Sequence, residues 1–131
     1  MPEQRTVLVA DDDELLRDLV AELLESELGL RVVGAADGYQ AILAIQRERP
    51  DLILLDLRMP RVDGYGVLRW LRSRGPTGQI PVLALSATVA ADLAHALTRG
   101  CQGAVAKPFD IDDLLEAVRA ALAPARRAAA G

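Results

Sequence analysis

Five short runs of apolar and β-branched residues alternate along the chain with segments in which apolar residues recur at helical spacing. The runs are Thr6–Ala10, Arg31–Ala35, Leu52–Leu55, Pro81–Leu85 and Gly103–Ala106. Runs of this length suit strands, and the third is apolar enough to lie buried at the centre of a sheet. Strand–helix alternation with short connections requires a parallel sheet with helices on both faces. The sequence therefore predicts a doubly wound, five-stranded α/β domain.

The predicted helices fill the intervals between these runs. They are Asp13–Glu27, a second helix marked by Ala41 to Ile45 and ending before Pro50, Tyr65–Arg74, Ala90–Arg99 and Asp110–Leu122. Gly29 suits the left-handed C-terminal cap of the first helix, and Asp110 suits the N-terminal cap of the last.

Apolar spacing indicates which side of each helix faces the core. The first helix repeats leucine and valine at i, i+3 and i+4, over Leu16, Leu19, Val20, Leu23 and Leu24. The fourth helix is expected to turn Leu93, Ala96 and Leu97 inward.

Composition limits the range of functions. A net charge of −4 provides no broad basic face, so direct binding of nucleic acid is not expected. The single cysteine, Cys101, cannot close an internal disulfide, which favours a reducing compartment. No apolar stretch approaches the ~20 residues that span a bilayer, and the N-terminus lacks the layout of a signal peptide. We therefore expect a cytoplasmic protein without membrane contact, with one domain over 1–123 and a disordered tail or linker start over 124–131.

Polar residues follow four of the predicted strands at the point where each strand ends. Asp11 and Asp12 follow the first strand, Asp56 the third, Ser86 the fourth and Lys107 the fifth. Ligands of open α/β sheets bind outside the carboxyl ends of the strands. These side chains should therefore converge at one edge, where carboxylates, a hydroxyl and an ammonium suit a divalent metal and a phosphoryl group.

This ordered set resembles the receiver domain of two-component response regulators, from about Thr6 to Leu122. Met59-Pro60, Asp63-Gly64 and the Lys107-Pro108 pair belong to the same resemblance. The resemblance implies a flavodoxin-like sheet with strand order 2-1-3-4-5. It also implies a Lys107-Pro108 peptide bond that is often cis.

The resemblance further implies the role of each site residue. Asp12 and Asp56 would bind Mg²⁺ directly, Asp11 directly or through water, and Arg58 through its backbone carbonyl. Asp56 would be the nucleophile that accepts the phosphoryl group, while Lys107 and the hydroxyl of Ser86 would contact phosphoryl oxygens. The chain would not turn over a diffusible substrate, because it would only accept the phosphoryl group and slowly lose it.

The implied partners are a sensor histidine kinase or a histidine phosphotransfer protein, docked on the first helix and nearby loops. A downstream protein effector or a covalently linked output domain would read the signal from the fourth helix, fifth strand and fifth helix. One position departs from the family pattern. Ala104 stands three residues before Lys107, where an aromatic residue is usual, so the customary aromatic switch is missing.

Simpler interpretations remain open for several residues. The acidic run could only cap the first helix, which is our favoured interpretation for Asp13. Ser86 could be an ordinary helix-entry serine, Lys107 a solvated lysine, and the Arg58 side chain could point to solvent. We expect a surface position for His95, a buried one for Cys101 and partial burial for Trp70.

Two other functions compete with phosphoryl acceptance coupled to a switch. An aspartyl-phosphate phosphohydrolase would need a second acid two residues after the nucleophile, where this chain has Arg58. A receiver-like adaptor that binds proteins without phosphorylation stays open because of Ala104. A nucleotide-binding Rossmann domain is excluded, because the loop after the first strand is rich in aspartate where glycines are required.

Overall fold

A computed structural model describes residues 4–87 and 89–123, apart from the side chains of residues 76, 77, 89 and 90. One parallel sheet contains five strands, as the sequence predicts, and their order, β2-β1-β3-β4-β5, is the one that the resemblance to receiver domains implies. The strands are β1 (Thr6–Ala10), β2 (Arg31–Ala35), β3 (Leu52–Asp56), β4 (Val82–Ser86) and β5 (Gly103–Ala106). The predicted tail, 124–131, lies outside the described residues.

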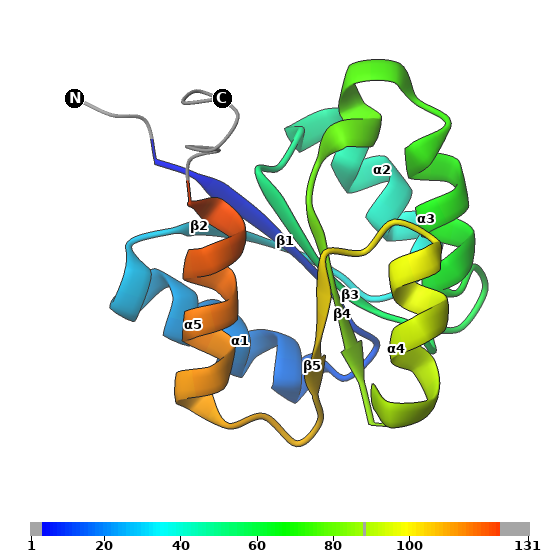
Figure 1. Cartoon of the computed structure of the whole chain (residues 1–131). Helices are drawn as coiled ribbons and strands as arrows, with labels where there is room; N and C mark the ends of the chain where they lie inside the picture. Colours follow the sequence, from blue (N-terminus) through cyan, green and yellow to red (C-terminus); the bar gives the residue numbers. More distant parts are fainter. Residues whose placement is uncertain (1–3, 88, 124–131) are drawn as a thin grey trace, which may run out of the picture.

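Helices cover both faces of the sheet (Figure 1). Helices α1 (Glu14–Leu28) and α5 (Ile111–Leu122) lie on one face, and α2 (Gly38–Glu48), α3 (Gly64–Arg72) and α4 (Val89–Thr98) lie on the other. None of the helices in the described ranges has the length and apolar character that a bilayer span requires.

Among the described residues, four aspartates cap helices at their N-termini. Asp13 accepts a hydrogen bond from Leu16 N at 3.1 Å at the start of α1, and Asp110 caps α5 in the same way. Asp37 and Asp63 cap α2 and α3. At the other end of α1, Gly29 adopts a left-handed φ of 65°, which closes the helix as predicted.

The connection after α3 differs from the prediction. The helix ends at Arg72 and not at Arg74, and a 3₁₀ helix, η1 (Gly75–Gln79), follows it. Ser73 Oγ donates to the carbonyl of Trp70 at 2.6 Å and so satisfies one of the last carbonyls of α3. The Arg72 guanidinium donates to carbonyls of Gly78, Ile80 and Gly100, which holds the connection against the body of the domain.

Strand side chains alternate between two cores. Leu52 and Leu54 of β3 pack toward α1 and α5, whereas Ile53 and Leu55 pack toward α2, α3 and α4. Every residue of β3 is buried, because both faces of the central strand are covered. The same alternation continues past the strand ends and decides where the polar side chains point.

Two helix-face predictions were wrong. Leu19 of α1 is 48% exposed and Leu97 of α4 is 47% exposed. In α1 the fully buried residues are Val20 and Leu24, which are spaced by four, so the helix turns Leu19 away from the core. Leu15 is also exposed, on the same outward side.

Cys101 is buried between α4 and β5, as expected. Burial raises the pKa of its thiol from 9.0 to about 11, although the nearby Arg72 charge opposes the shift. Because the thiolate is the reactive form, a thiol reagent at pH 8 should modify the native protein about a hundredfold or more slowly than the unfolded chain. Stopped-flow labelling with and without denaturant measures the ratio, and equal rates would contradict this environment.

Candidate functional site

The carboxyl edge of the sheet gathers polar side chains from three strands on the α1/α5 side. Asp11 extends the register of Val7 and Val9, and Asp56 extends that of Leu52 and Leu54, all of which face α1 and α5. Lys107 follows Val105 of β5 in the same way. Alternation therefore directs two carboxylates and one ammonium toward a common point.

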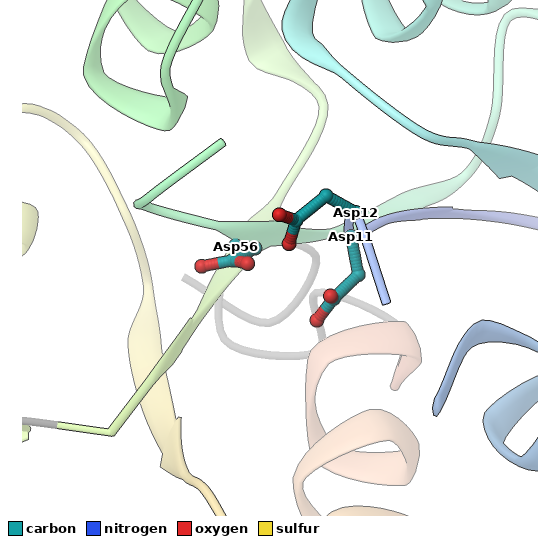
Figure 2. Close-up of side chains that lie close together, drawn as sticks. All are labelled: Asp11, Asp12 and Asp56. Atoms are coloured by element: carbon teal, nitrogen blue, oxygen red, sulfur yellow. The ribbon is translucent and has the colours of Figure 1, made fainter. Parts of the chain in front are cut away.

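The carboxylates of Asp11, Asp12 and Asp56 form one cluster (Figure 2). Each contributes an oxygen, and these oxygens all lie within 4.8 Å of one another. Asp11 and Asp56 are buried, at 0% and 5% exposure, whereas Asp12 is exposed. Asp11 and Asp56 are each fixed by a backbone amide two residues later, that of Asp13 and that of Arg58, both at 2.9 Å.

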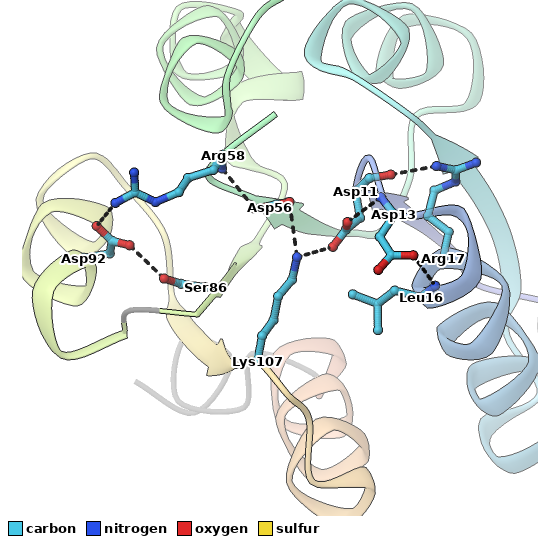
Figure 3. Close-up of polar contacts among 9 residues, drawn as sticks. All are labelled: Asp11, Asp13, Leu16, Arg17, Asp56, Arg58, Ser86, Asp92 and Lys107. Carbon is cyan, nitrogen blue, oxygen red and sulfur yellow. Dashed lines mark hydrogen bonds and ion pairs between the residues drawn. The ribbon is translucent and has the colours of Figure 1, made fainter. Parts of the chain in front are cut away.

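Lys107 joins the two buried carboxylates (Figure 3). Its Nζ lies 2.7 Å from Asp11 Oδ2 and 3.2 Å from Asp56 Oδ2. Burial acts to lower the pKa of Lys107, but the contacts with Asp11 and Asp56 outweigh it and raise the pKa above its ordinary value. The ammonium is therefore charged at neutral pH and compensates part of the negative charge of the cluster. The Lys107-Pro108 peptide bond is cis.

The pKa of Asp56 is raised above its ordinary value. Burial is the main cause that raises the pKa of Asp56, and the Asp11 carboxylate adds to the increase. The Arg58 amide and the Lys107 ammonium act in the opposite direction without cancelling it. An additional cation at this cluster would stabilise the ionised form.

The donor set fits a hard divalent cation. Carboxylate oxygens are the ligands that Mg²⁺ prefers, and few of them are needed because the ion retains waters. Asp11 Oδ2 is buried and, although it is ion-paired with Lys107, it accepts no well-formed hydrogen bond from the described residues. It therefore has lone-pair capacity for a metal or a metal-bound water.

Ser86 points to the other side of the sheet. It extends the register of Val82 and Ala84, which face α3 and α4. Its Oγ donates to Asp92 Oδ2 of α4 at 2.7 Å, and Arg58 Nη2 lies 3.6 Å from Asp92 Oδ1 (Figure 3). Asp92 was not among the site residues predicted from the sequence. An acid in the first turn of a helix is ordinary, and its position six residues after Ser86 was the one available signal.

The remaining candidates occupy ordinary positions. His95 is exposed, with its ring 6.5 Å from that of Tyr65. Trp70 is half-buried, with the Arg74 guanidinium 4.8 Å from the ring centroid. The Arg58 side chain is 75% exposed, apart from its contact with Asp92.

The sequence and the fold place the chain in a known family. Residues 7–119 match the family model described as the response regulator receiver domain. This chain is a response regulator receiver domain. Receiver domains of this kind are signalling modules of two-component systems.

Individual relatives agree with the assignment. The receiver is 42% identical over 118 residues to the probable transcriptional regulatory protein TcrX of Mycobacterium tuberculosis, covering 89% of this chain and 49% of TcrX. It is 30% identical to the polar-differentiation response regulator DivK of Brucella anthropi, covering 92% of this chain and 98% of DivK. The chain thus spans about half the length of TcrX and nearly all of DivK.

A solved structure provides a chemical parallel to the acidic cluster. The receiver domain of the sensor histidine kinase PA1611 from Pseudomonas aeruginosa has a TM-score of 0.82 and 31% identity to this chain. The match covers 92% of this chain and 98% of that domain. That receiver domain has a magnesium ion coordinated in its active-site cleft.

Proposed function

We propose that this receiver accepts a phosphoryl group on Asp56 from a phosphohistidine, with Mg²⁺ bound at the acidic cluster. The observation that supports this most is the contact of one ammonium, Lys107 Nζ, with both buried carboxylates, Asp11 and Asp56. Together with Asp12, these groups provide a nucleophile, a metal-binding set and a fixed positive charge within one small region.

Each residue has a distinct part in the proposed reaction. Asp56 attacks the phosphorus with one carboxylate oxygen, and the donor imidazole leaves with the electron pair of the broken P–N bond. The Arg58 amide fixes Asp56 Oδ1 at 2.9 Å and so orients the nucleophile. Lys107 then pairs with an equatorial phosphoryl oxygen, and Ser86 donates to another.

Bound Mg²⁺ would neutralise the charge that gathers on the phosphoryl oxygens. Asp11, Asp12, Asp56 and the Arg58 carbonyl are the groups proposed to hold it. The bond formed is a mixed anhydride on Asp56, and slow hydrolysis of that anhydride resets the receiver. Residues 1–123 are proposed as the receiver domain, with 124–131 as a tail or the start of a linker.

Labelling by a small phosphodonor tests the proposal. Incubation with acetyl phosphate and Mg²⁺ should add one phosphoryl group per chain, measured by intact-protein mass spectrometry, and a chelator should prevent the addition. Continuous release of phosphate from a generic phosphate ester would instead favour the phosphohydrolase. A chain that is never labelled, with or without metal, would favour the adaptor that works without phosphorylation.

Lys107 should compete with the metal for the same oxygens. Lys107→Ala is expected to raise the affinity for Mg²⁺ about tenfold, because an ammonium no longer occupies the space between the carboxylates. The same change should slow labelling, because a charge on the phosphoryl group is lost. Calorimetric titration measures the affinity, and Arg119→Ala, which removes an exposed charge from the last turn of α5, is the control. Equal gains in Mg²⁺ affinity in both variants would mean that the change in net charge, and not the position of Lys107, causes the effect.

The proposed donor surface is α1, which begins directly after the acidic run. Leu15 and Leu19 are exposed, at 81% and 48%, and lie one turn apart. Exposed apolar side chains beside a reaction site suit a docked kinase or phosphotransfer domain. The double change Leu15→Ser and Leu19→Ser should slow labelling by a phosphotransfer domain about tenfold and leave labelling by acetyl phosphate unchanged. An equal loss with both donors would contradict docking at α1.

The signal of phosphorylation is proposed to reach a protein effector or a linked output domain through α4, β5 and α5. Ala104 is half-buried in β5, so this strand provides no aromatic side chain at the usual switch position. The signal must therefore reach α4 through other contacts of the site.

A further inference from the structure

We propose that Asp92, on α4, is a positioning residue. It accepts the hydrogen bond of the Ser86 hydroxyl until a phosphoryl oxygen on Asp56 replaces it as the acceptor. This inference rests on the proposed function, because it concerns the same phosphoryl site. It adds a residue that competes with the phosphoryl group and connects the site to α4.

The Ser86–Asp92 contact is short and shielded from solvent. Ser86 Oγ lies 2.7 Å from Asp92 Oδ2, and the Asp92 side chain is 13% exposed, while Ser86 is 4% exposed. Hydrogen bonds to an ionised carboxylate are about twice as strong as neutral ones. Water competes poorly at such a site, so the hydroxyl has a preferred partner on α4.

A hydroxyl carries one proton and can donate one hydrogen bond. While Ser86 donates to Asp92, it cannot also donate to a phosphoryl oxygen on Asp56. The two hydrogen bonds exclude each other. The free energy of the Ser86–Asp92 hydrogen bond is therefore subtracted from the free energy that Ser86 can contribute to binding the phosphoryl group. Asp92 therefore stabilises the conformation of the unmodified receiver relative to that of the phosphorylated receiver.

Arg58 adds a second contact to the same carboxylate. Arg58 Nη2 lies 3.6 Å from Asp92 Oδ1, so Asp92 is in contact with the last residue of β4 and with a residue that follows β3. Figure 3 shows Ser86 and Arg58 approaching the two oxygens of Asp92 from different elements. A phosphoryl group on Asp56 offers new acceptors to Ser86 and Arg58, and α4 then loses both of these contacts with Asp92. This exchange gives the receiver a route to α4 that needs no aromatic residue at Ala104.

Beryllium fluoride with Mg²⁺, a mimic of the phosphoryl group, tests the competition. Asp92→Ala is expected to bind the mimic roughly tenfold more tightly than the wild type, because Ser86 no longer has to leave a charged partner. Titrations followed by backbone amide NMR give both affinities. The control is Asp112→Ala, which removes an exposed acid from the first turn of α5 and should change the affinity little.

A double-mutant cycle separates positioning from charge. If Asp92 acts through Ser86, Asp92→Ala should produce no gain in a Ser86→Ala background. A gain that persists in full in that background would overturn the proposal, since release of Arg58 or loss of a negative charge would then explain it. Without Mg²⁺ or mimic, amide hydrogen exchange of α4 should be faster in Asp92→Ala and in Ser86→Ala than in the wild type. Unchanged exchange in both variants would also overturn the proposal.

The outcomes distinguish this inference from the function on which it rests. If the wild type binds the mimic and Asp92→Ala binds it equally well, the role of Asp92 is wrong and the phosphoryl site stands. If neither protein binds it at millimolar concentration, the proposed function fails and the role of Asp92 fails with it.

Discussion

Asp56→Asn is expected to abolish labelling by acetyl phosphate, with a loss of at least about a thousandfold that no increase in Mg²⁺ restores. Asparagine has nearly the same shape as aspartate, but its amide is not a nucleophile and cannot form the anhydride. Mass spectrometry of the intact protein measures the result. Asp51→Asn, at the exposed opposite end of the same strand, is the control and should be labelled normally. Persistent stoichiometric labelling of Asp56→Asn would place the phosphoryl group elsewhere.

The same variant should be more stable than the wild type in metal-free solution at neutral pH. Burial raises the pKa of Asp56, so the folded state binds its proton more tightly than the unfolded state does. The stabilising contribution of this group is present below its unfolded pKa of about 3.9 and is lost as the pH rises through the folded pKa. At neutral pH the ionised carboxylate is therefore a cost, which asparagine removes. Urea denaturation at pH 7 should show a higher midpoint for Asp56→Asn, and a lower midpoint would contradict the electrostatic account.

Gly64→Ala is expected to destabilise the domain by about 3 kcal/mol and to slow labelling as well. Gly64 begins α3, where helix propensity alone would favour alanine by about 1 kcal/mol. An added Cβ, however, would lie 2.5 Å from the carbonyl oxygen of Asp56 and 2.7 Å from Leu57 Cα. These are backbone atoms, so the start of α3 or the end of β3 has to move. Movement of β3 displaces the nucleophile.

Gly34→Ala is a matched control for that change. Its Cβ would meet only the flexible side chain of Arg17, at 3.6 Å, and the strand position is exposed. Denaturation should show little loss of stability, and labelling should stay normal. Similar losses in both variants would mean that general effects of replacing glycine, and not contact with the Asp56 backbone, explain Gly64→Ala.

Local sequence patterns were sufficient to predict most of the fold, because each pattern depends on residues that are close together in the chain. The run Leu52–Leu55 favours a central strand, since both of its faces are apolar, and β3 is buried throughout. Gly29 and Asp110 marked helix ends through their own backbone and side-chain chemistry. Leu19 was placed wrongly because an apolar residue beside the buried stripe has the same spacing whether it faces the core or a partner.

The connection between α3 and β4 could not be predicted from local patterns. Its 3₁₀ helix depends on Arg72, whose guanidinium binds carbonyls of Gly78, Ile80 and Gly100. One of these carbonyls lies beyond α4 in the chain, so no sequence window contains the interaction. An arginine in the last turn of a helix looks like an ordinary favourable charge until its partners are known.

By itself, the sequence determined the parallel sheet and the edge at which the polar residues would gather. Strand ends are fixed by apolar runs, and the carboxyl ends of parallel strands meet at one edge. Only the tertiary structure decided how those side chains divide between partners. Lys107 contacts Asp11 and Asp56 on one side of the sheet, whereas Ser86 contacts Asp92 on the other. The reason is the alternation of side chains along a strand, because one residue of register sends a side chain to the opposite face, where a different helix provides its partner.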